Sequence, residues 1–378
     1  MKAPPAPVFL QKRAFTLVEL LVSMVIVVLL LLILVSITDQ TRRTWTYTTS
    51  KVEQFRDSRE AFESITRRIS QATLNTYWDY HYPNDDTSKP PDSYVRQSEL
   101  RFISGSANTL TVATNRPTHA VFFQAPLGFV QDTTTYAGIN QLENLLNTWG
   151  YYLEWNSDKT SRPAFLPASF PEHYRFRLME MMEPSEKLTV YQYTSGLTGT
   201  TAKNLTYKGK EWFTTPLAVA PQPGGVSQQR VVADNVIALI ILPKLSQSDQ
   251  KAKDPITGIS SNYTDSSLAP SYDYDTTYDK QSDPNLNPHN QLPPEVLVTM
   301  VAVDEATFGR LQGSSATMPD YTKDLFQKAG NLSDSSVDGY AKDLAALQTT
   351  LQTNHLNYRI FSTTVSLKAA KWSRSQKK

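Results

Sequence analysis

The residues best suited to bind a metal ion form an acidic run late in the chain: Asp273, Asp275, Asp279 and Asp283. Calcium takes roughly six to eight oxygen ligands from carboxylates, carbonyls and water, so this run is a candidate calcium site. It lacks the turn glycine and the closing glutamate of an EF-hand loop. The competing interpretation is a solvated, flexible loop. Apart from calcium, no cofactor is predicted.

Side chains arranged for catalysis are sparse. The chain contains no cysteine, which excludes disulfides and thiolate chemistry. No nucleophile elbow, phosphate-binding glycine loop or dinucleotide fingerprint occurs. No two of the histidines lie at a metal-ligand spacing; they are His81, His119, His173, His289 and His355. We therefore predict that the protein is not an enzyme, and we keep a membrane-tethered enzyme only as a third hypothesis.

Glu19 is a carboxylate inside a long apolar stretch. Apolar residues fill the chain almost without interruption from Phe15 to Ile37, and roughly 20 are enough to cross a bilayer core as a helix. Lys12 and Arg13 precede the stretch, and such basic flanks stay on the cytoplasmic side. Residues 15–38 are therefore predicted to be a transmembrane helix. A charge inside it either has a functional partner or reaches water at the interface.

The stretch from Arg13 to Val22, RAFTLVELLV, resembles the class III signal of type IV prepilins and type II secretion pseudopilins. In that family a prepilin peptidase cuts before the Phe on the cytoplasmic side and usually methylates the new N-terminus. The resemblance implies a leader peptide at residues 1–14, with Ala14 before the cut and Phe15 as the new terminus. Ala14 stands where the family usually has Gly.

The resemblance also gives Glu19 a role. The new amine of Phe15 is cationic and must enter an apolar filament core, where a charge is tolerable only when it is paired. The resemblance implies that Glu19 of a neighbouring subunit neutralises this amine. It also implies the partners: a prepilin peptidase, other pilin-like subunits and the inner membrane.

The apolar pattern continues past the membrane segment with helical spacing. Positions that recur at sums of three and four residues are Trp45, Val52, Phe55, Phe62, Ile65, Ile69 and Ala72. No proline occurs between Val8 and Tyr82. We predict an amphipathic stem helix at residues 39–76, continuous with the membrane helix. The alternative is a break between Thr38 and Thr49.

Residues 77–368 are predicted to form an α+β head. The predicted strands are Leu100–Ile103, Thr109–Thr114, Ala120–Gln124, Tyr151–Trp155, Tyr174–Met181, Leu188–Tyr193, Val231–Leu242, Val296–Val303 and Tyr358–Leu367. The predicted helices include Asn140–Asn147 and Ser336–Asn354. The expected fold is thus a long N-terminal helix, first transmembrane and then amphipathic, packed on an antiparallel sheet as in pilins.

Two segments of the head region have a distinctive composition. Residues 246–294 are rich in Ser, Asp, Asn and Pro and poor in aliphatic residues, so we predict a flexible surface insertion between two strands. Residues 369–378 form a basic tail, with Lys371, Arg374, Lys377 and Lys378.

Two aromatic clusters could either fill the core or bind a ligand. The first is Tyr77, Trp78, Tyr80 and Tyr82, and the second is Trp149, Tyr151, Tyr152 and Trp155. Exposed rings could grip carbohydrate or a partner protein. Packing between a long helix and a sheet is the favoured interpretation of both clusters.

Charge argues against a nucleic-acid partner. The chain has a net charge of +1, with 19% charged residues, and neutralising phosphates requires a clear cationic surplus. No nucleic acid is therefore expected. Hydrophobic residues make up 40% of the chain, enough for a packed core.

The resemblance extends to the head through short phrases. The stretch Leu292–Met300, LPPEVLVTM, is similar to one in J-type minor pseudopilins, and the phrases Val298–Glu305 and Tyr358–Val365 are similar to the Verru_Chthon cassette protein C family. This implies a minor pseudopilin-like subunit of a type II secretion or type IV pilus-like filament, with a periplasmic head. The alternative is a pilin-anchored binding head for adhesion, carbohydrate or DNA uptake.

Overall fold

The structure is a computed structural model that describes residues 16–139, 142–162, 165–167, 169–192, 209–218, 228–251, 263–279, 286–305, 308–309, 315–331 and 334–373. The chain divides into two units, Met1–Gln54 and Phe55–Lys378. The described helices are α1 (Leu17–Ile69), α2 (Ala107–Thr111), α3 (Thr189–Gln192), α5 (Glu211–Ala218), α6 (Gln247–Gln250) and α8 (Gly339–Thr353). The described strands are β1 (Tyr77–His81), β2 (Ser93–Gln97), β3 (Phe102–Ser106), β4 (His119–Pro126), β5 (Leu146–Ser157), β6 (Tyr174–Glu183), β7 (Gln229–Asp234), β8 (Val236–Lys244), β9 (Tyr274–Asp275), β10 (Glu295–Val303), β11 (Gly330–Asn331), β12 (Asp334–Asp338) and β13 (Tyr358–Ser366).

Helix α1 contains 53 residues and has no break between Thr38 and Thr49. It ends at Ile69, seven residues before the predicted end of the stem. After the helix, hydrogen bonds join residues three apart in the chain: the Ala72 amide donates to the Ile69 carbonyl at 3.0 Å. The Thr73 amide then donates to the Gln124 carbonyl of β4 at 2.9 Å, so from this point the backbone is hydrogen-bonded to a strand instead of to the helix.

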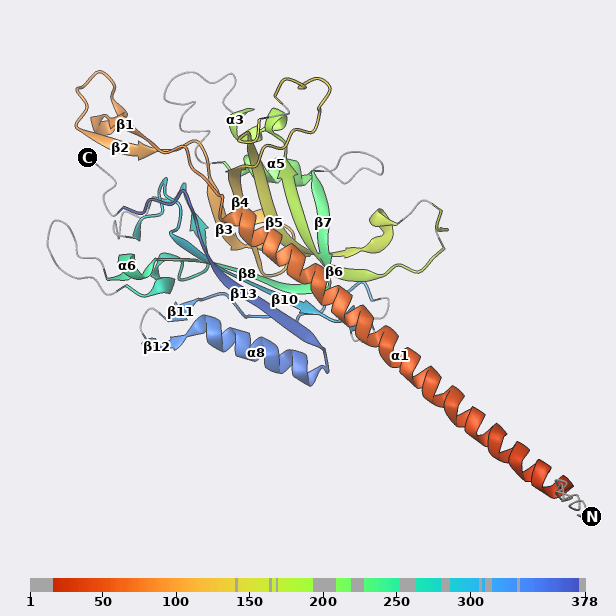
Figure 1. The fold of residues 1–378 in the computed structure, drawn as a ribbon. Coiled ribbons are helices and arrows are strands. Elements are labelled where there is room, and N and C mark those ends of the chain that lie inside the picture. The colour runs from red at the N-terminus through yellow and green to blue at the C-terminus, as the bar shows by residue number, and fades with distance from the viewer. Residues whose placement is uncertain are drawn as a thin grey trace, which may run out of the picture. The chain divides into compact units, whose positions relative to one another are not determined.

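The larger sheet has six strands in the order β7-β6-β5-β4-β3-β9, and every neighbouring pair is antiparallel. The smaller sheet has the order β13-β10-β8 and is also antiparallel. Strands β1 and β2 form a separate two-stranded sheet, which stands apart from the other sheets in Figure 1. Antiparallel sheets with helices against their faces confirm the predicted α+β fold class.

Strand β10, the middle strand of the smaller sheet, is buried on both faces. Its residues alternate between two cores: Val298 and Met300 face the first, and Val301 and Val303 face the second. The first core also holds the larger sheet and the end of α1. The second core is closed by Leu347 and other residues of α8, which lies beside this sheet in Figure 1.

Within the second unit, the C-terminal part of the predicted apolar stripe is buried, whereas Trp45 at its start is 74% exposed. Phe62, Ile65, Ile69 and Ala72 are buried in the first core, and the Phe62 ring lies 5.8 Å from that of Phe361 in β13. This burial confirms that the amphipathic face packs on the sheets of the head.

A buried ion cluster ties the end of α1 to the larger sheet. Glu180 on β6 is almost fully buried and pairs with Arg68 on α1 and with Arg230 on β7. The Tyr151 hydroxyl donates to the same carboxylate at 2.9 Å, and the Arg68 guanidinium lies 4.2 Å from the centre of the Trp149 ring. A buried carboxylate with this many donors is compensated, so the cluster has a structural role.

The predicted single strand Val231–Leu242 is wrong, because the chain turns inside it. Asn235 adopts φ 58°, a left-handed conformation that ends β7 and starts β8. β7 is the edge of the larger sheet, whereas β8 belongs to the smaller sheet. Asparagine tolerates this conformation better than other residues with a Cβ atom.

Three further local predictions are wrong. Thr109–Thr114 is not a strand, because α2 ends at Thr111 and buries Ala107 and Leu110 on one side. Leu188–Tyr193 contains helix α3 instead of a strand, at least through Gln192. The described part of Asn140–Asn147 is not helical and leads into β5 at Leu146. In each case tertiary burial or strand pairing overrides a local propensity.

The predicted flexible insertion at 246–294 is corrected for the stretches that the structure describes. Tyr272 and Tyr274 are almost fully buried, and β9 pairs with β3. Leu268 and Leu292 enter the first core. The segment does connect two strands, β8 and β10, as predicted. Its few large apolar residues, however, pack into a core that is formed mainly by other parts of the chain.

Candidate processing site and membrane anchor

The first part of α1 is apolar on all sides. It contains a candidate membrane span at Leu17–Thr49, and none of the most apolar window is buried within the chain. Leu30, Leu31 and Leu32 follow one another around the helix about 100° apart, and each is more than half exposed. A helix that is apolar all round needs an apolar environment, which a bilayer or neighbouring helices supply. This single N-terminal helix fits single-pass membrane anchoring.

The start of α1 is closed by a reciprocal pair of side chains, Thr16 and Glu19. The Thr16 amide and hydroxyl each donate to Glu19 Oε2 at 3.2 Å, and the Glu19 amide donates to Thr16 Oγ1 at 3.3 Å. This is the capping-box arrangement, which satisfies amides that the first turn leaves without partners. Glu19 therefore has a partner in its own chain, which neither of its predicted roles included.

Thr16 was missed as a site residue by the sequence reasoning. The signal was present, because Thr followed three residues later by Glu before an apolar run is the pattern of a capping box. The other predicted processing residues, Lys12, Arg13, Ala14 and Phe15, lie outside the described residues, as does the whole leader at 1–14.

Comparison with known proteins gives a family match near the N-terminus of the chain. Residues 10–35 match the family model of the prokaryotic N-terminal methylation motif. No curated protein matches the chain, and no solved structure matches it. The motif is that of type IV prepilin-like proteins. Together with the apolar helix and the antiparallel head, it supports a type IV pilin-like protein in general terms.

The acidic run proposed for calcium is divided by the fold. Asp275 accepts bonds from the amide and hydroxyl of Thr277 at 2.8 and 2.7 Å, and Asp279 accepts from Asn287 Nδ2 at 2.6 Å. Asp283 lies outside the described residues. Among the described residues, no group of three or more acidic or histidine side chains is placed to hold a metal ion. Calcium binding stays a prediction.

Asp273 lines a polar cavity of about 490 Å³. Burial raises the pKa of its carboxyl group, against a hydrogen bond from the Ser106 backbone and the charge of Lys210. Asp320 and Arg116 also line the cavity, and Arg116 Nε contacts Glu154 at 3.0 Å. The cavity can accept a small polar molecule, but its described side chains form no recognisable catalytic arrangement.

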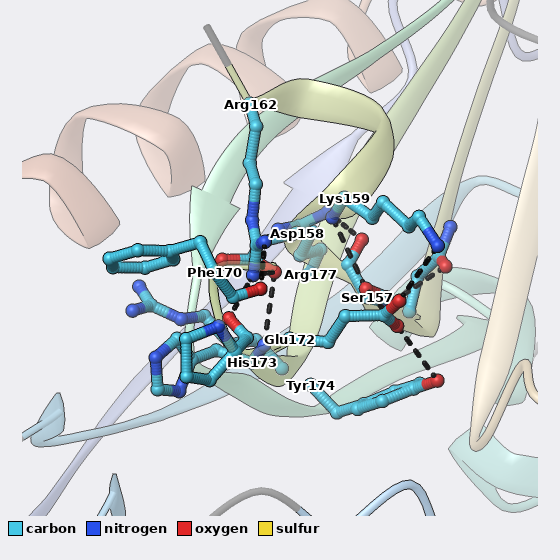
Figure 2. Close-up of polar contacts among 12 residues, drawn as sticks. Ser157, Asp158, Lys159, Arg162, Phe170, Glu172, His173, Tyr174 and Arg177 are labelled. Atoms are coloured by element: carbon cyan, nitrogen blue, oxygen red, sulfur yellow. Dashed lines mark hydrogen bonds and ion pairs between the residues drawn. The ribbon is translucent and has the colours of Figure 1, made fainter. Parts of the chain in front are cut away.

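A second polar cluster is structural and holds the β5–β6 connection, as Figure 2 shows. Asp158 accepts from Arg162 Nη2 at 2.7 Å and from the His173 amide at 3.0 Å. Burial acts to raise the pKa of Asp158, but these bonds outweigh it and hold the pKa below its ordinary value. Glu172 accepts from the Ser157 hydroxyl at 3.0 Å and pairs with Lys159 at 3.0 Å. These contacts hold together the two ends of the β5–β6 connection. The charged groups joined by dashed lines in Figure 2 pair with one another in a structural role.

The two aromatic clusters differ in solvent exposure. Trp149, Tyr151, Tyr152 and Trp155 are buried, so the core interpretation holds for the second cluster. In the first cluster, Trp78 and Tyr80 are exposed, and Tyr77 and Tyr82 are half-buried. The core interpretation is therefore wrong for the exposed members of the first cluster.

Proposed function

We propose that this chain is a minor pilin-like subunit, matured by a prepilin peptidase that cuts between Ala14 and Phe15 and methylates the new N-terminus. The observation that carries the proposal is the match to the N-terminal methylation motif at 10–35, continuous with a helix that is apolar on all sides. A leader cut at this point would leave Thr16 and Glu19 in the first turn of the mature helix.

Under this proposal the subunit spans the inner membrane once. Lys12 and Arg13 keep the N-terminus in the cytoplasm, and the head lies in the periplasm. Other pilin-like subunits would cover the apolar helix once it leaves the bilayer for a filament. The head makes up most of the second unit, Phe55–Lys378. It is large for a subunit that must repeat closely along a filament, which favours a minor position. The similarity of its phrases to J-type and Verru_Chthon cassette proteins stays a hypothesis.

Glu19 would serve two purposes in turn. In the single chain its Oε2 atom accepts two bonds from Thr16. A carboxylate has about four acceptor positions, so it can also accept the charged amine of Phe15 from a neighbouring subunit. Such a pair would offset the cost of placing an ammonium group in an apolar filament core.

The experiment is intact mass and N-terminal sequencing of the protein from membranes, with and without active prepilin peptidase. The expected result is a chain that starts at methylated Phe15 only when the peptidase is present. Thr16→Ala and Glu19→Gln should both be cut, because the cut lies before them. A chain that keeps residues 1–14 beside active peptidase would refute the proposal and leave a plain single-span anchor.

A further inference from the structure

The two-stranded sheet β1–β2 carries an aromatic face with no assigned purpose. The register places Trp78 opposite Arg96 and Tyr80 opposite Tyr94. Because side chains alternate across a strand, these four residues lie on one face, and Tyr82 follows the same alternation just after β1.

The aromatic rings of this face are exposed to solvent, although Arg96 on the same face is buried. Tyr80 is 52% exposed, Tyr94 46% and Trp78 37%, whereas the alternate positions Tyr77 and Asp79 are half-buried. An antiparallel sheet with one wet face normally turns its apolar residues inward and its polar residues outward. Here the large rings face outward, and contiguous exposed rings of this kind mark an interaction site.

The rings of Tyr80, Tyr82 and Tyr94 form one continuous surface. The Tyr80 ring centre lies 5.1 Å from that of Tyr94 and 6.4 Å from that of Tyr82. A hydrogen bond between the Tyr80 and Tyr94 hydroxyls raises the pKa of Tyr94 above its ordinary value. The Tyr94 phenol therefore stays neutral at physiological pH. The hydroxyl groups of Tyr80 and Tyr94 offer donors and acceptors beside the exposed ring faces.

The charge of the face indicates which ligand fits it. Arg96 is its one charged residue, is only 8% exposed, and lies with its guanidinium 5.5 Å from the centre of the Trp78 ring. Two acids of the β1–β2 connection have partners of their own: Asp92 contacts the His81 ring at 2.6 Å, and Asp86 accepts from the Ser88 hydroxyl. A phosphate chain would find no exposed cation on this face, so the complementary ligand is uncharged.

We propose that the face formed by Trp78, Tyr80, Tyr82 and Tyr94 binds an uncharged polysaccharide chain. Sugar rings present flat C–H faces that are attracted to the negative faces of aromatic rings. Their hydroxyl groups can exchange hydrogen bonds with the phenols of Tyr80 and Tyr94. The proposal goes beyond the pilin-like function and does not depend on it, since it concerns the head alone.

The test uses the full chain in detergent micelles and soluble hexasaccharides of cellulose, chitin, laminarin and amylose as probes. Binding is measured by calorimetry and by the change in tryptophan fluorescence. At least one probe should bind saturably, and Tyr80→Ser and Tyr94→Ser should each weaken it by about tenfold. Tyr80→Phe keeps the ring and should weaken binding less. Tyr278→Ser removes an exposed tyrosine elsewhere and should change binding by less than about twofold.

Several results would overturn the proposal. One is that none of the four probes binds, and another is that the Tyr80→Ser and Tyr94→Ser variants bind as tightly as the parent. Binding to phosphatidylcholine vesicles instead of the sugars, lost in the same variants, would make the face a membrane contact. Binding to oligothymidine instead would make it a nucleic-acid platform. The Tyr80→Phe variant keeps the test decisive if a serine variant does not fold.

Discussion

Replacing Glu183 with Gln should change how the stability of the head depends on pH. Glu183 ends β6 and is almost fully buried. Its Oε2 atom accepts bonds from the amide and hydroxyl of Thr189, at the start of α3, at 3.1 and 3.2 Å. Burial raises the pKa of this carboxyl from 4.5 to about 7, although the bonds from Thr189 act to lower it.

The size of the effect follows from linkage. The folded pKa of Glu183 lies above the unfolded value, so folding favours the protonated acid. Its contribution is fully present below the unfolded pKa of 4.5 and is lost as pH rises through about 7. A gap of about 2.5 units corresponds to about 3 kcal/mol at high pH, of which roughly 2–3 kcal/mol is lost between pH 5 and pH 8. Glu183→Gln stays neutral and keeps an oxygen acceptor for Thr189.

The assay is denaturant unfolding of the full chain in detergent at pH 5 and pH 8, followed by tryptophan fluorescence. The parent should lose roughly 2–3 kcal/mol more than Glu183→Gln between the two pH values. Glu143→Gln changes an exposed carboxylate and should keep the parent's pH dependence. If the parent and Glu183→Gln differ by the same amount at both pH values, the buried carboxyl does not titrate in this range, and the reasoning is wrong.

Three further predictions concern the helix and the core. Thr16→Ala should destabilise the first turn of α1 by about 1 kcal/mol, as measured by hydrogen exchange. Glu19→Gln keeps an acceptor for the cap and should instead reduce cross-linking to neighbouring subunits. Equal effects of the two variants on cross-linking would contradict separate roles for the two residues. Ile65→Ala should lower the free energy of unfolding by roughly 2–5 kcal/mol, because Ile65 is fully buried. The control Arg59→Ala, on the exposed side of the helix, should lower it by less than about 1 kcal/mol. Similar losses in the two variants would show that Ile65 is not a core residue. Burial lowers the pKa of His119 to about 4, so its ring should stay neutral in NMR spectra down to about pH 5, and titration near the ordinary 6.5 would refute its burial. Since the folded pKa of His119 is depressed, its contribution to stability is present above pH 6.5 and is lost as pH falls to about 4.

The predicted site divides into a part that sequence could reach and a part that it could not. The N-terminal signal is local, since the basic flank, the methylation motif and the apolar run lie next to one another along the chain. The capping box of Thr16 and Glu19 is equally local and could have been recognised from the spacing of the two residues. The aromatic face could not, because the spacing of Trp78 and Tyr80 is the same whether the rings point to the core or to solvent.

The sequence by itself determined the long apolar helix, the amphipathic face that packs on the head and most strands of the head. These features depend on periodicity and length, which are properties of neighbouring residues. Only the tertiary structure decided that Asn235 divides one apolar run between two sheets, that Tyr272 and Tyr274 fill the core from a polar segment, and that the rings of β1 and β2 face outward. Each of these outcomes depends on which distant segment covers a given face, and local propensity carries no information about that partner.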